Sequence, residues 1–531
     1  MARASRATAV LALLAATCLP AGALHAQAKA KAPPKPAVKK ASPKDLALEK
    51  ELLKATRKVE TAHAKELEKI VTWAATNGLK AEAGKTVEKI AALDEEYSGL
   101  EKLRAKAAKA APVDEGKAED LRKTFAKKVE DANEKNAARL FDFATKCMRV
   151  GLFTRAYDLV NAVIEADPDH KRARDILSYA WDPGAKTWIS KWEASMKKDH
   201  FLTPEGWVPK KEKARWDKGL REYQGKWVPR EEEERIRKRN EYNAASASTE
   251  HFEVRTNLGR EKAFEFALLL EDFYRQFFRV YIGFYDQVAG AKLLFNQAKL
   301  KKKHQVLLFP SRARYEQFVR AEKGNDELLL ESGGFYESGS RMSYFYWTDD
   351  LSGVLHTLYH EVTHQLFAET KERGGGSQGN NWIVEGIASY MESWVKVGGK
   401  WHPGANLGSN RLQTAKAFLS ANPGWSLASY ARIGHDEFHR ENRGLNYCLG
   451  AALSHFFMHH QDGIYKEDFV QLISAYYGGQ LAEDSLGQYI AVEGASTPEE
   501  VVATLEKQFK EYMKDLGSIP VEAASTGDAG Q

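Results

Sequence analysis

The chain has 531 residues, of which 43% are hydrophobic, and this length and composition predict two to four domains with cores of their own. Its formal net charge is only +5 at pH 7, so charge gives no indication of a nucleic-acid partner, and none is expected. Three cysteines are too few for a disulfide framework.

The N-terminus has the pattern of an export signal. Two arginines precede an apolar segment at residues 9–19 that is too short to span a membrane, and a small-x-small pattern follows it. We therefore expect residues 1–28 to be a signal peptide cleaved near Ala26 or Ala28, and the mature protein to be periplasmic or extracellular. No later segment has the length and apolarity of a transmembrane helix, so none is expected in the mature chain.

The two ends of the mature chain are predicted to lack regular structure. Residues 29–43 are rich in lysine, alanine and proline, which is typical of an extended or disordered tether. Residues 517–531 are expected to be a disordered tail. Cys147 and Cys448, which remain after cleavage, are predicted to be buried thiols, with a disulfide between them as the alternative.

Residues 44–180 contain an internal repeat. The segment around Gly78 resembles the segment around Gly151, 73 residues further along the chain. In each copy one helix is predicted to end near the glycine and a second helix to begin after it. Helix pairs of this kind are typical of tetratricopeptide-like hairpins, which usually bind partner proteins or act as scaffolds. A protein partner is therefore expected at this region.

Residues 181–248 form a tryptophan-rich connector. Trp207-Val208-Pro209 recurs twenty residues later as Trp227-Val228-Pro229, each time after a glycine-containing turn. Glutamates follow the second proline, which predicts a helix start there. We expect small strand–turn–helix units that dock the repeats onto the next domain, and the alternative is glycan binding by exposed tryptophans.

The next region, residues 249–516, is predicted to begin with a small mixed sheet. Alternating and β-branched residues predict strands, and an aromatic-rich pattern predicts a helix between the first two of them. The expected elements are a strand at 251–256, a helix at 261–282, a strand at 304–309 and a hairpin at 333–346.

The most informative pattern of the chain is His360-Glu361-Val362-Thr363-His364. The residues from 352 to 367 contain no proline and carry apolar side chains at helical spacing, which predicts a helix. Two imidazoles at positions i and i+4 of a helix lie one above the other and can take two corners of a Zn²⁺ tetrahedron. The adjacent Glu361 can serve as general base for a zinc-bound water. His356 and His360 have the same spacing, but no glutamate follows His356, so the later pair is preferred.

A hydrolytic zinc site needs a third protein ligand and an open position for water. The best candidate is Glu385, which stands among apolar neighbours in a second predicted helix at residues 382–392. Small residues beside it, such as Gly386, would let this helix approach the first closely. A glycine-rich turn at residues 373–377 joins the two helices, so the expected unit is helix, glycine loop and helix with an inward glutamate.

These residues resemble the gluzincin metallopeptidases, and among them the aminopeptidase N and leukotriene hydrolase type. The tryptophan, glutamate, glycine, alanine and tyrosine of residues 382–390 stand in the same order in the second motif of that type. Tyr447, three residues before Gly450, matches a third element in which the tyrosine stabilises the tetrahedral oxyanion. The chain is also similar to a group of secreted bacterial proteins with such a domain behind helical repeats. The resemblance covers residues 249–516, about half the chain.

Two positions depart from the aminopeptidase pattern. That type holds the substrate amine with a glycine-x-x-glutamate strand, which residues 334–337 match superficially, but Glu337 is better explained as part of a hairpin turn. Ser389 stands where thermolysin-like enzymes place an aspartate that orients a histidine, so Glu392 is the candidate for that support. The resemblance therefore implies metal-dependent hydrolysis but leaves aminopeptidase specificity open.

The resemblance implies a multidomain, mainly α protein whose α+β domain is a zinc-dependent peptidase acting on a peptide or protein substrate. His360, His364 and Glu385 would bind Zn²⁺. Glu361 would take a proton from water, and Tyr447 would stabilise the oxyanion. Five histidines are alternatives to the tyrosine as a cationic donor: His435, His439, His455, His459 and His460. The competing hypothesis is a noncatalytic envelope scaffold with a degenerate metallopeptidase domain.

Overall fold

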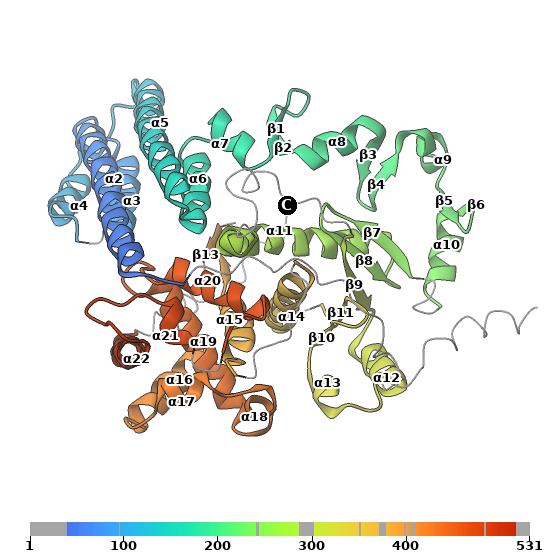
Figure 1. The fold of residues 1–531 in the computed structure, drawn as a ribbon. Coiled ribbons are helices and arrows are strands. Elements are labelled where there is room, and N and C mark those ends of the chain that lie inside the picture. Colours follow the sequence, from blue (N-terminus) through green and yellow to red (C-terminus); the bar gives the residue numbers. More distant parts are fainter. Residues whose placement is uncertain are drawn as a thin grey trace, which may run out of the picture. The chain divides into compact units, whose positions relative to one another are not determined.

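The structure is a computed structural model that describes residues 40–94, 96–239, 244–285, 302–349, 352–370, 379–397, 400–402, 404, 409–482 and 485–516. The predicted signal peptide, most of the predicted tether, the glycine-rich turn and the predicted tail lie outside these residues. The described chain is mainly helical and has one small mixed sheet, as the sequence predicts (Figure 1).

Two helical hairpins form the N-terminal part of the described chain. The first pairs α2 (Pro43–Thr76) with α3 (Lys80–Leu93), and the second pairs α5 (Ala118–Val150) with α6 (Phe153–Ala166), while α4 (Leu100–Ala108) lies between them in sequence. The connecting glycines, Gly78 and Gly151, have φ angles of +77° and +84°, a backbone conformation that favours glycine. The short helices α3 and α6 begin and end 73 residues apart, so the predicted repeat of hairpins is confirmed.

The predicted state of the two cysteines is confirmed. Cys147 and Cys448 are both free and buried, so the alternative of a disulfide between them does not hold. Cys147 packs within the second hairpin, and burial raises the pKa of its thiol to about 12.

The connector consists of three hairpin–helix units rather than the two that the tryptophan motif predicts. The additional unit comes first in the chain. Its second strand contains no proline, but the two strands of this unit pair in the same antiparallel way as those of the other units. After α7 (Lys171–Ile176), the units are β1 (Tyr179–Asp182), β2 (Thr187–Ser190) and α8 (Lys191–Asp199); β3 (His200–Thr203), β4 (Gly206–Pro209), η1 (Lys210–Glu212) and α9 (Lys213–Trp216); and β5 (Leu220–Tyr223), β6 (Lys226–Pro229) and α10 (Arg230–Arg237).

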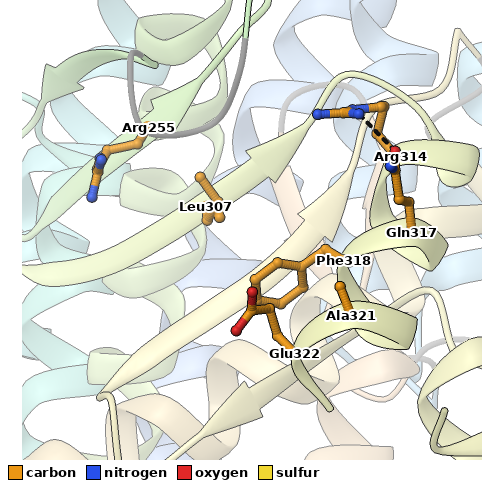
Figure 2. Close-up of a pocket in the computed structure, with 7 residues that line it drawn as sticks. All are labelled: Arg255, Leu307, Arg314, Gln317, Phe318, Ala321 and Glu322. Carbon is orange, nitrogen blue, oxygen red and sulfur yellow. Dashed lines mark hydrogen bonds between the residues drawn. The ribbon is translucent and has the colours of Figure 1, made fainter. Parts of the chain in front are cut away.

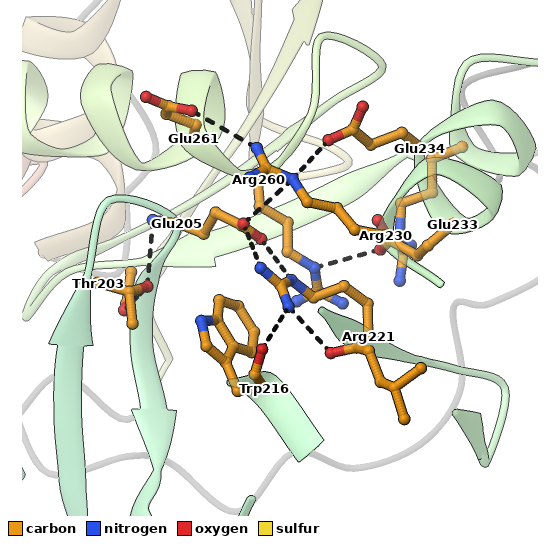
Figure 3. Close-up of polar contacts among 12 residues, drawn as sticks. Thr203, Glu205, Trp216, Arg221, Arg230, Glu233, Glu234, Arg260 and Glu261 are labelled. Atoms are coloured by element: carbon orange, nitrogen blue, oxygen red, sulfur yellow. Dashed lines mark hydrogen bonds and ion pairs between the residues drawn. The ribbon is translucent and has the colours of Figure 1, made fainter. Parts of the chain in front are cut away.

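A buried ion pair joins the last two connector units to each other (Figure 3). The guanidinium of Arg221 donates two hydrogen bonds to Glu205, of 3.0 and 2.7 Å, and lies 3.4 Å from the centre of the Trp216 ring. Arg260, at the start of α11 (Arg260–Tyr285), forms an ion pair of 3.2 Å with Glu233 of the third unit. The connector therefore contacts the helix that covers the main sheet.

The main sheet has the strand order β10-β11-β9-β8-β7. Its three inner strands, β8 (Phe252–Thr256), β9 (His304–Phe309) and β11 (Met342–Tyr346), are parallel, whereas β7 (Ala245–Ser248) and β10 (Gly334–Glu337) are antiparallel edge strands. The register of β10 against β11 pairs Glu337 with Met342, so the predicted hairpin is confirmed and its turn lies between these two residues.

Alternate side chains of the sheet enter two different cores. Val306, Leu308 and Phe345 pack on the face covered by α11 and α14 (Ser352–Thr370). Leu307 and Phe309 pack on the opposite face, against α12 (Arg312–Glu322) and near α13 (Glu327–Glu331). The sheet is thus the middle layer between two helical layers, and α14 lies on the α11 face beside edge strand β10.

The remaining described elements are mainly helices, which pack around the side of α14. Trp382 at the start of α15 is fully buried, with its ring centre 6.0 Å from those of Phe457 and Phe469. No helix in the described chain is both long and apolar enough to cross a membrane. The elements are α15 (Trp382–Glu392), β12 (Val395–Val397), β13 (Lys400–His402), α16 (Asn410–Ala421), α17 (Leu427–Ala431), α18 (His435–Arg440), α19 (Arg443–His459), α20 (Lys466–Tyr477), α21 (Leu486–Tyr489) and α22 (Pro498–Asp515).

Candidate metal centre

The three predicted metal ligands lie together between α14 and α15. One carboxylate oxygen of Glu385 is 3.2 Å from Nε2 of His360 and 3.4 Å from Nε2 of His364. Bonds of about 2.0–2.2 Å in a tetrahedral zinc site place neighbouring ligand atoms about 3.3–3.6 Å apart. One ligand atom from each residue falls in a group whose members are all within 4.8 Å of one another, so the donor set fits Zn²⁺.

The packing of α15 explains how Glu385 reaches this position. The helix is apolar on nearly all sides and lies between α14 and α19, so its one central acid is buried and points to the two histidines. Gly386 does not provide the approach to α14 that the sequence predicts. A Cβ atom at Gly386 would lie 2.5 Å from the backbone oxygen of Gly450, because this glycine is on the side of α15 that faces α19.

The charges of the ligand set are mutually stabilising. Burial alone would raise the pKa of Glu385, but His364 and the hydrogen bond from His360 hold it well below its usual range. Burial alone would lower the pKa of His360, but its bonds to Glu385 and Glu392 raise it to about 10. A metal ion at Nε2 of this ring would therefore displace a proton.

Glu361 lies between the ligand histidines and the edge of the sheet. Its carboxylate accepts a hydrogen bond of 2.9 Å from the backbone N–H of Tyr336 in β10. Burial raises the pKa of Glu361, and His360 and His364 oppose that rise. A carboxylate with a raised pKa beside a metal site has the properties of a general base.

Glu392, which the sequence predicts to support a ligand histidine, contacts two histidines of α14, His356 and His360. The ring N–H at Nδ1 of His360 donates to the Glu392 carboxylate over 2.6 Å, which leaves Nε2 directed toward Glu385. Nδ1 of His356 donates to the Glu392 backbone carbonyl over 3.0 Å. His356 is therefore a hydrogen-bonded neighbour of the centre and is not in its ligand group, in line with the preference for the later histidine pair.

Two further side chains lie beside Glu385, those of Tyr447 and His439, and both residues come after residue 430 in the sequence. The Tyr447 ring stacks on the His360 ring with 6.0 Å between the ring centres, and its phenol lies close enough to Glu385 to be affected by the charge of that carboxylate. Burial and the negative charge of Glu385 raise the pKa of this phenol, so it keeps its proton. Nε2 of His439 is 3.7 Å from the other Glu385 oxygen.

The other four histidines considered as donors have different surroundings. His435 is exposed beside Asp436. His455 forms hydrogen bonds with the backbone oxygen of Gly404 and with the hydroxyl of Tyr512. His459 is 2.9 Å from the hydroxyl of Tyr390, and His460 stacks on Tyr465. Among these alternatives the described chain brings only His439 to the ligand set. Its position follows from tertiary packing of α18, for which the sequence carries no spacing signal.

Glu337 is engaged away from the ligand set. Its carboxylate forms a salt bridge with Lys323, the residue after α12, and accepts a hydrogen bond of 2.6 Å from Ser340 in the hairpin turn. These contacts hold the pKa of Glu337 below its usual value although burial opposes them. The turn interpretation of residues 337–340 is therefore consistent with the geometry.

A second group of close ligand atoms consists of Glu250, His251 and Glu271, but Lys303 lies near both carboxylates and supplies a positive charge there.

A pocket of about 270 Å³ lies on the α12 face of the sheet and is lined by Arg255, Leu307, Arg314, Gln317, Phe318, Ala321 and Glu322 (Figure 2). Because α14 lies on the opposite face, this pocket contributes no residue to the metal centre.

Comparisons with protein-family models, with curated proteins and with solved structures found no match for this chain.

Proposed function

We propose that this chain is an exported zinc-dependent peptidase of the gluzincin type. The observation that supports the proposal is the spacing of His360, His364 and Glu385, which suits a tetrahedral zinc ion, with Glu361 adjacent. Zn²⁺ in such a set would activate a water molecule and polarise a carbonyl group. The signal-like pattern at residues 1–28 supports export.

Glu361 is the general base in this proposal. It takes a proton from the attacking water and later passes it to the leaving amine. Its hydrogen bond from the Tyr336 N–H fixes the carboxylate, and its raised pKa brings proton uptake closer to neutral pH. Tyr447 keeps its proton and donates it in a hydrogen bond to the oxyanion that forms when water attacks the carbonyl.

An extended peptide is the substrate that fits the surroundings of Glu361. In the described chain, β10 pairs only with β11, so its outer edge can align a peptide by strand addition through backbone groups other than the Tyr336 N–H, which Glu361 holds, and the Gly334 carbonyl, which accepts from Ser332. Glu337 is paired with Lys323, which argues against a role in holding a substrate amine. We therefore propose a peptidase without aminopeptidase specificity.

The helical hairpins are proposed to bind a partner protein, in the manner of tetratricopeptide-like repeats. Their unit of 73 residues is about twice the length of roughly 34 residues that is usual in that class. The alternative to the peptidase is a noncatalytic scaffold, and the following experiment distinguishes the two.

The test is zinc content and peptide hydrolysis of the wild type and of Glu361→Gln. Both proteins should bind one zinc ion, and the variant should lose a factor of about 10²–10⁴ in kcat, because the amide cannot take a proton. Glu337→Gln is the matched control, since it removes a neighbouring carboxylate and should leave hydrolysis of blocked peptides unchanged. A wild type that binds no zinc, or that binds zinc and is as inert as Glu361→Gln on a broad peptide library, would refute the peptidase proposal.

A further inference from the structure

We propose that Arg411 is a positioning residue of the metal centre: it holds Glu392 against the ligand His360 and holds Tyr447 beside the ligand set. This inference rests on the proposed function, because it assumes that His360 binds a metal. Arg411 lies in α16, outside every motif of the sequence.

The contact with Glu392 is bidentate. Nε of Arg411 donates to one carboxylate oxygen of Glu392 over 2.7 Å, and Nη2 donates to the other over 3.0 Å. The second of these oxygens also accepts the Nδ1–H of His360 over 2.6 Å. A planar guanidinium fixes both oxygens of a carboxylate at once, which the point charge of a lysine cannot do. The orientation of Glu392, and with it the ring of His360, is therefore set by Arg411.

The second contact is with the phenol ring. The guanidinium carbon of Arg411 is 5.3 Å from the centre of the Tyr447 ring, within the range of a cation–π interaction. The same ring stacks on His360. Arg411 thus contacts two residues that both contact His360, Glu392 at the ring nitrogen Nδ1 and Tyr447 at the ring face.

The burial of Glu392 also favours a paired position beside Arg411. The Glu392 side chain is only 14% exposed, and a buried carboxylate is costly unless it is paired. Its side-chain partners are His360 and Arg411, and Arg411 is the partner that contacts both carboxylate oxygens.

The experiment compares Arg411→Ala and Arg411→Lys with Glu392→Gln and with a control, Lys416→Met, which removes a cation from the same helix. The measurements are zinc affinity by competition with a chelator, the visible absorption spectrum of the Co²⁺-substituted protein, and peptide hydrolysis with and without added guanidinium. Arg411→Ala should weaken zinc binding about 10-fold, the lower end of the range for such supporting partners, and change the Co²⁺ spectrum.

Four further outcomes are expected. The zinc affinity of Arg411→Lys should lie between that of the wild type and that of Arg411→Ala. Added guanidinium should restore zinc affinity and peptide hydrolysis in Arg411→Ala but not in Glu392→Gln. The loss caused by Arg411→Ala should shrink in the Glu392→Gln background, because both changes act through one chain of contacts. Lys416→Met should bind zinc like the wild type.

The inference is overturned if folded Arg411→Ala, or Arg411→Lys where the alanine variant does not fold, has the zinc affinity and Co²⁺ spectrum of the wild type. A wild type that binds zinc without cleaving any peptide would refute the peptidase while the affinity comparison still decides the role of Arg411. A wild type that binds no metal refutes both proposals.

Discussion

At the residue scale, Glu385 is surrounded by more polar partners than a metal ligand alone would need. Its two oxygens lie near His360, His364 and His439, and the phenol of Tyr447 is close enough for the charge of Glu385 to raise its pKa. In the proposed peptidase, Tyr447 and His439, which lie outside the predicted ligand set, would both be close to a substrate carbonyl bound beside Glu385. Both are uncharged, because Tyr447 keeps its proton and burial lowers the pKa of His439.

Replacing Tyr447 by phenylalanine distinguishes these two donors. We expect Tyr447→Phe to lower kcat by a factor of about 10², because one preorganised donor to the oxyanion is lost, and to leave zinc affinity nearly unchanged. His439→Asn should reduce kcat much less. Steady-state kinetics together with zinc titration of both variants is the measurement. The roles would be reversed if His439→Asn caused the larger loss of kcat.

The sequence predicts part of this centre and leaves the rest undetermined for a physical reason. His360, Glu361 and His364 follow from helical spacing, and Glu385 follows from being the one acid in the middle of an apolar helix. Arg411 carries no such signal, because its role depends on how α16 packs against α19 and α15. Contacts between helices separated by loops leave no periodic pattern in the chain.

At the scale of elements, the close approach of α15 and α19 depends on two glycines. Gly386→Ala should lower the free energy of unfolding by about 1–3 kcal/mol, because the added methyl group would meet the backbone of Gly450 at 2.5 Å. Gly84→Ala in α3 is the control, since nothing lies within 4 Å of its added Cβ, and it should stabilise by about 0.5–1 kcal/mol. Denaturant unfolding measures both changes. Equal stability of Gly386→Ala and the wild type would show that the two helices move apart at little cost.

Element positions were predictable wherever a pattern was local. The helix and strand ranges around residues 304–309 and 382–392 match the structure, because alternation and helical periodicity act over a few residues. The first connector unit was missed because its second strand lacks the tryptophan–valine–proline signal. The partner of Gly386 was predicted wrongly because small residues indicate close packing without indicating which helix approaches.

At the scale of the whole described chain, the second hairpin meets α20 through buried charges. Arg155 of α6 forms an ion pair of 2.9 Å with Glu49 of α2, and its backbone N–H donates to Glu467 of α20 over 2.7 Å. Asp468 lies near Glu49 and Glu467 and accepts the backbone N–H of Ala491. Three carboxyl groups thus lie close together, and Arg155 contacts two of them.

This surplus of acids predicts that stability falls as pH rises. Burial raises the pKa of Glu49 from 4.5 to about 7, and burial raises the pKa of Asp468 from 3.8 to about 7. Since the folded state holds these protons more tightly than the unfolded state, their contribution is fully present below about pH 4 and is lost as pH rises to about 7. The loss for Glu49 is on the order of 2–3 kcal/mol.

Chemical unfolding between pH 4 and pH 8 tests this expectation. Glu49→Gln should flatten the slope of stability against pH, because the amide cannot ionise. Glu51→Gln on the exposed side of α2 is the control and should retain the slope of the wild type. A wild type whose free energy of unfolding rises steadily over this range would contradict the assignment.

The backbone contact of Gly386 with Gly450 also limits how the metal centre can open. Because α15 and α19 pack closely at this point, we expect Glu385 and Tyr447 to move together. His360, Glu361 and His364 belong to α14. A motion that opens the metal centre would then separate α14 from α15, and with them the histidines from Glu385. A metal ion held by all three ligands would oppose this separation, so its removal should increase amide hydrogen exchange first in α14 and α15.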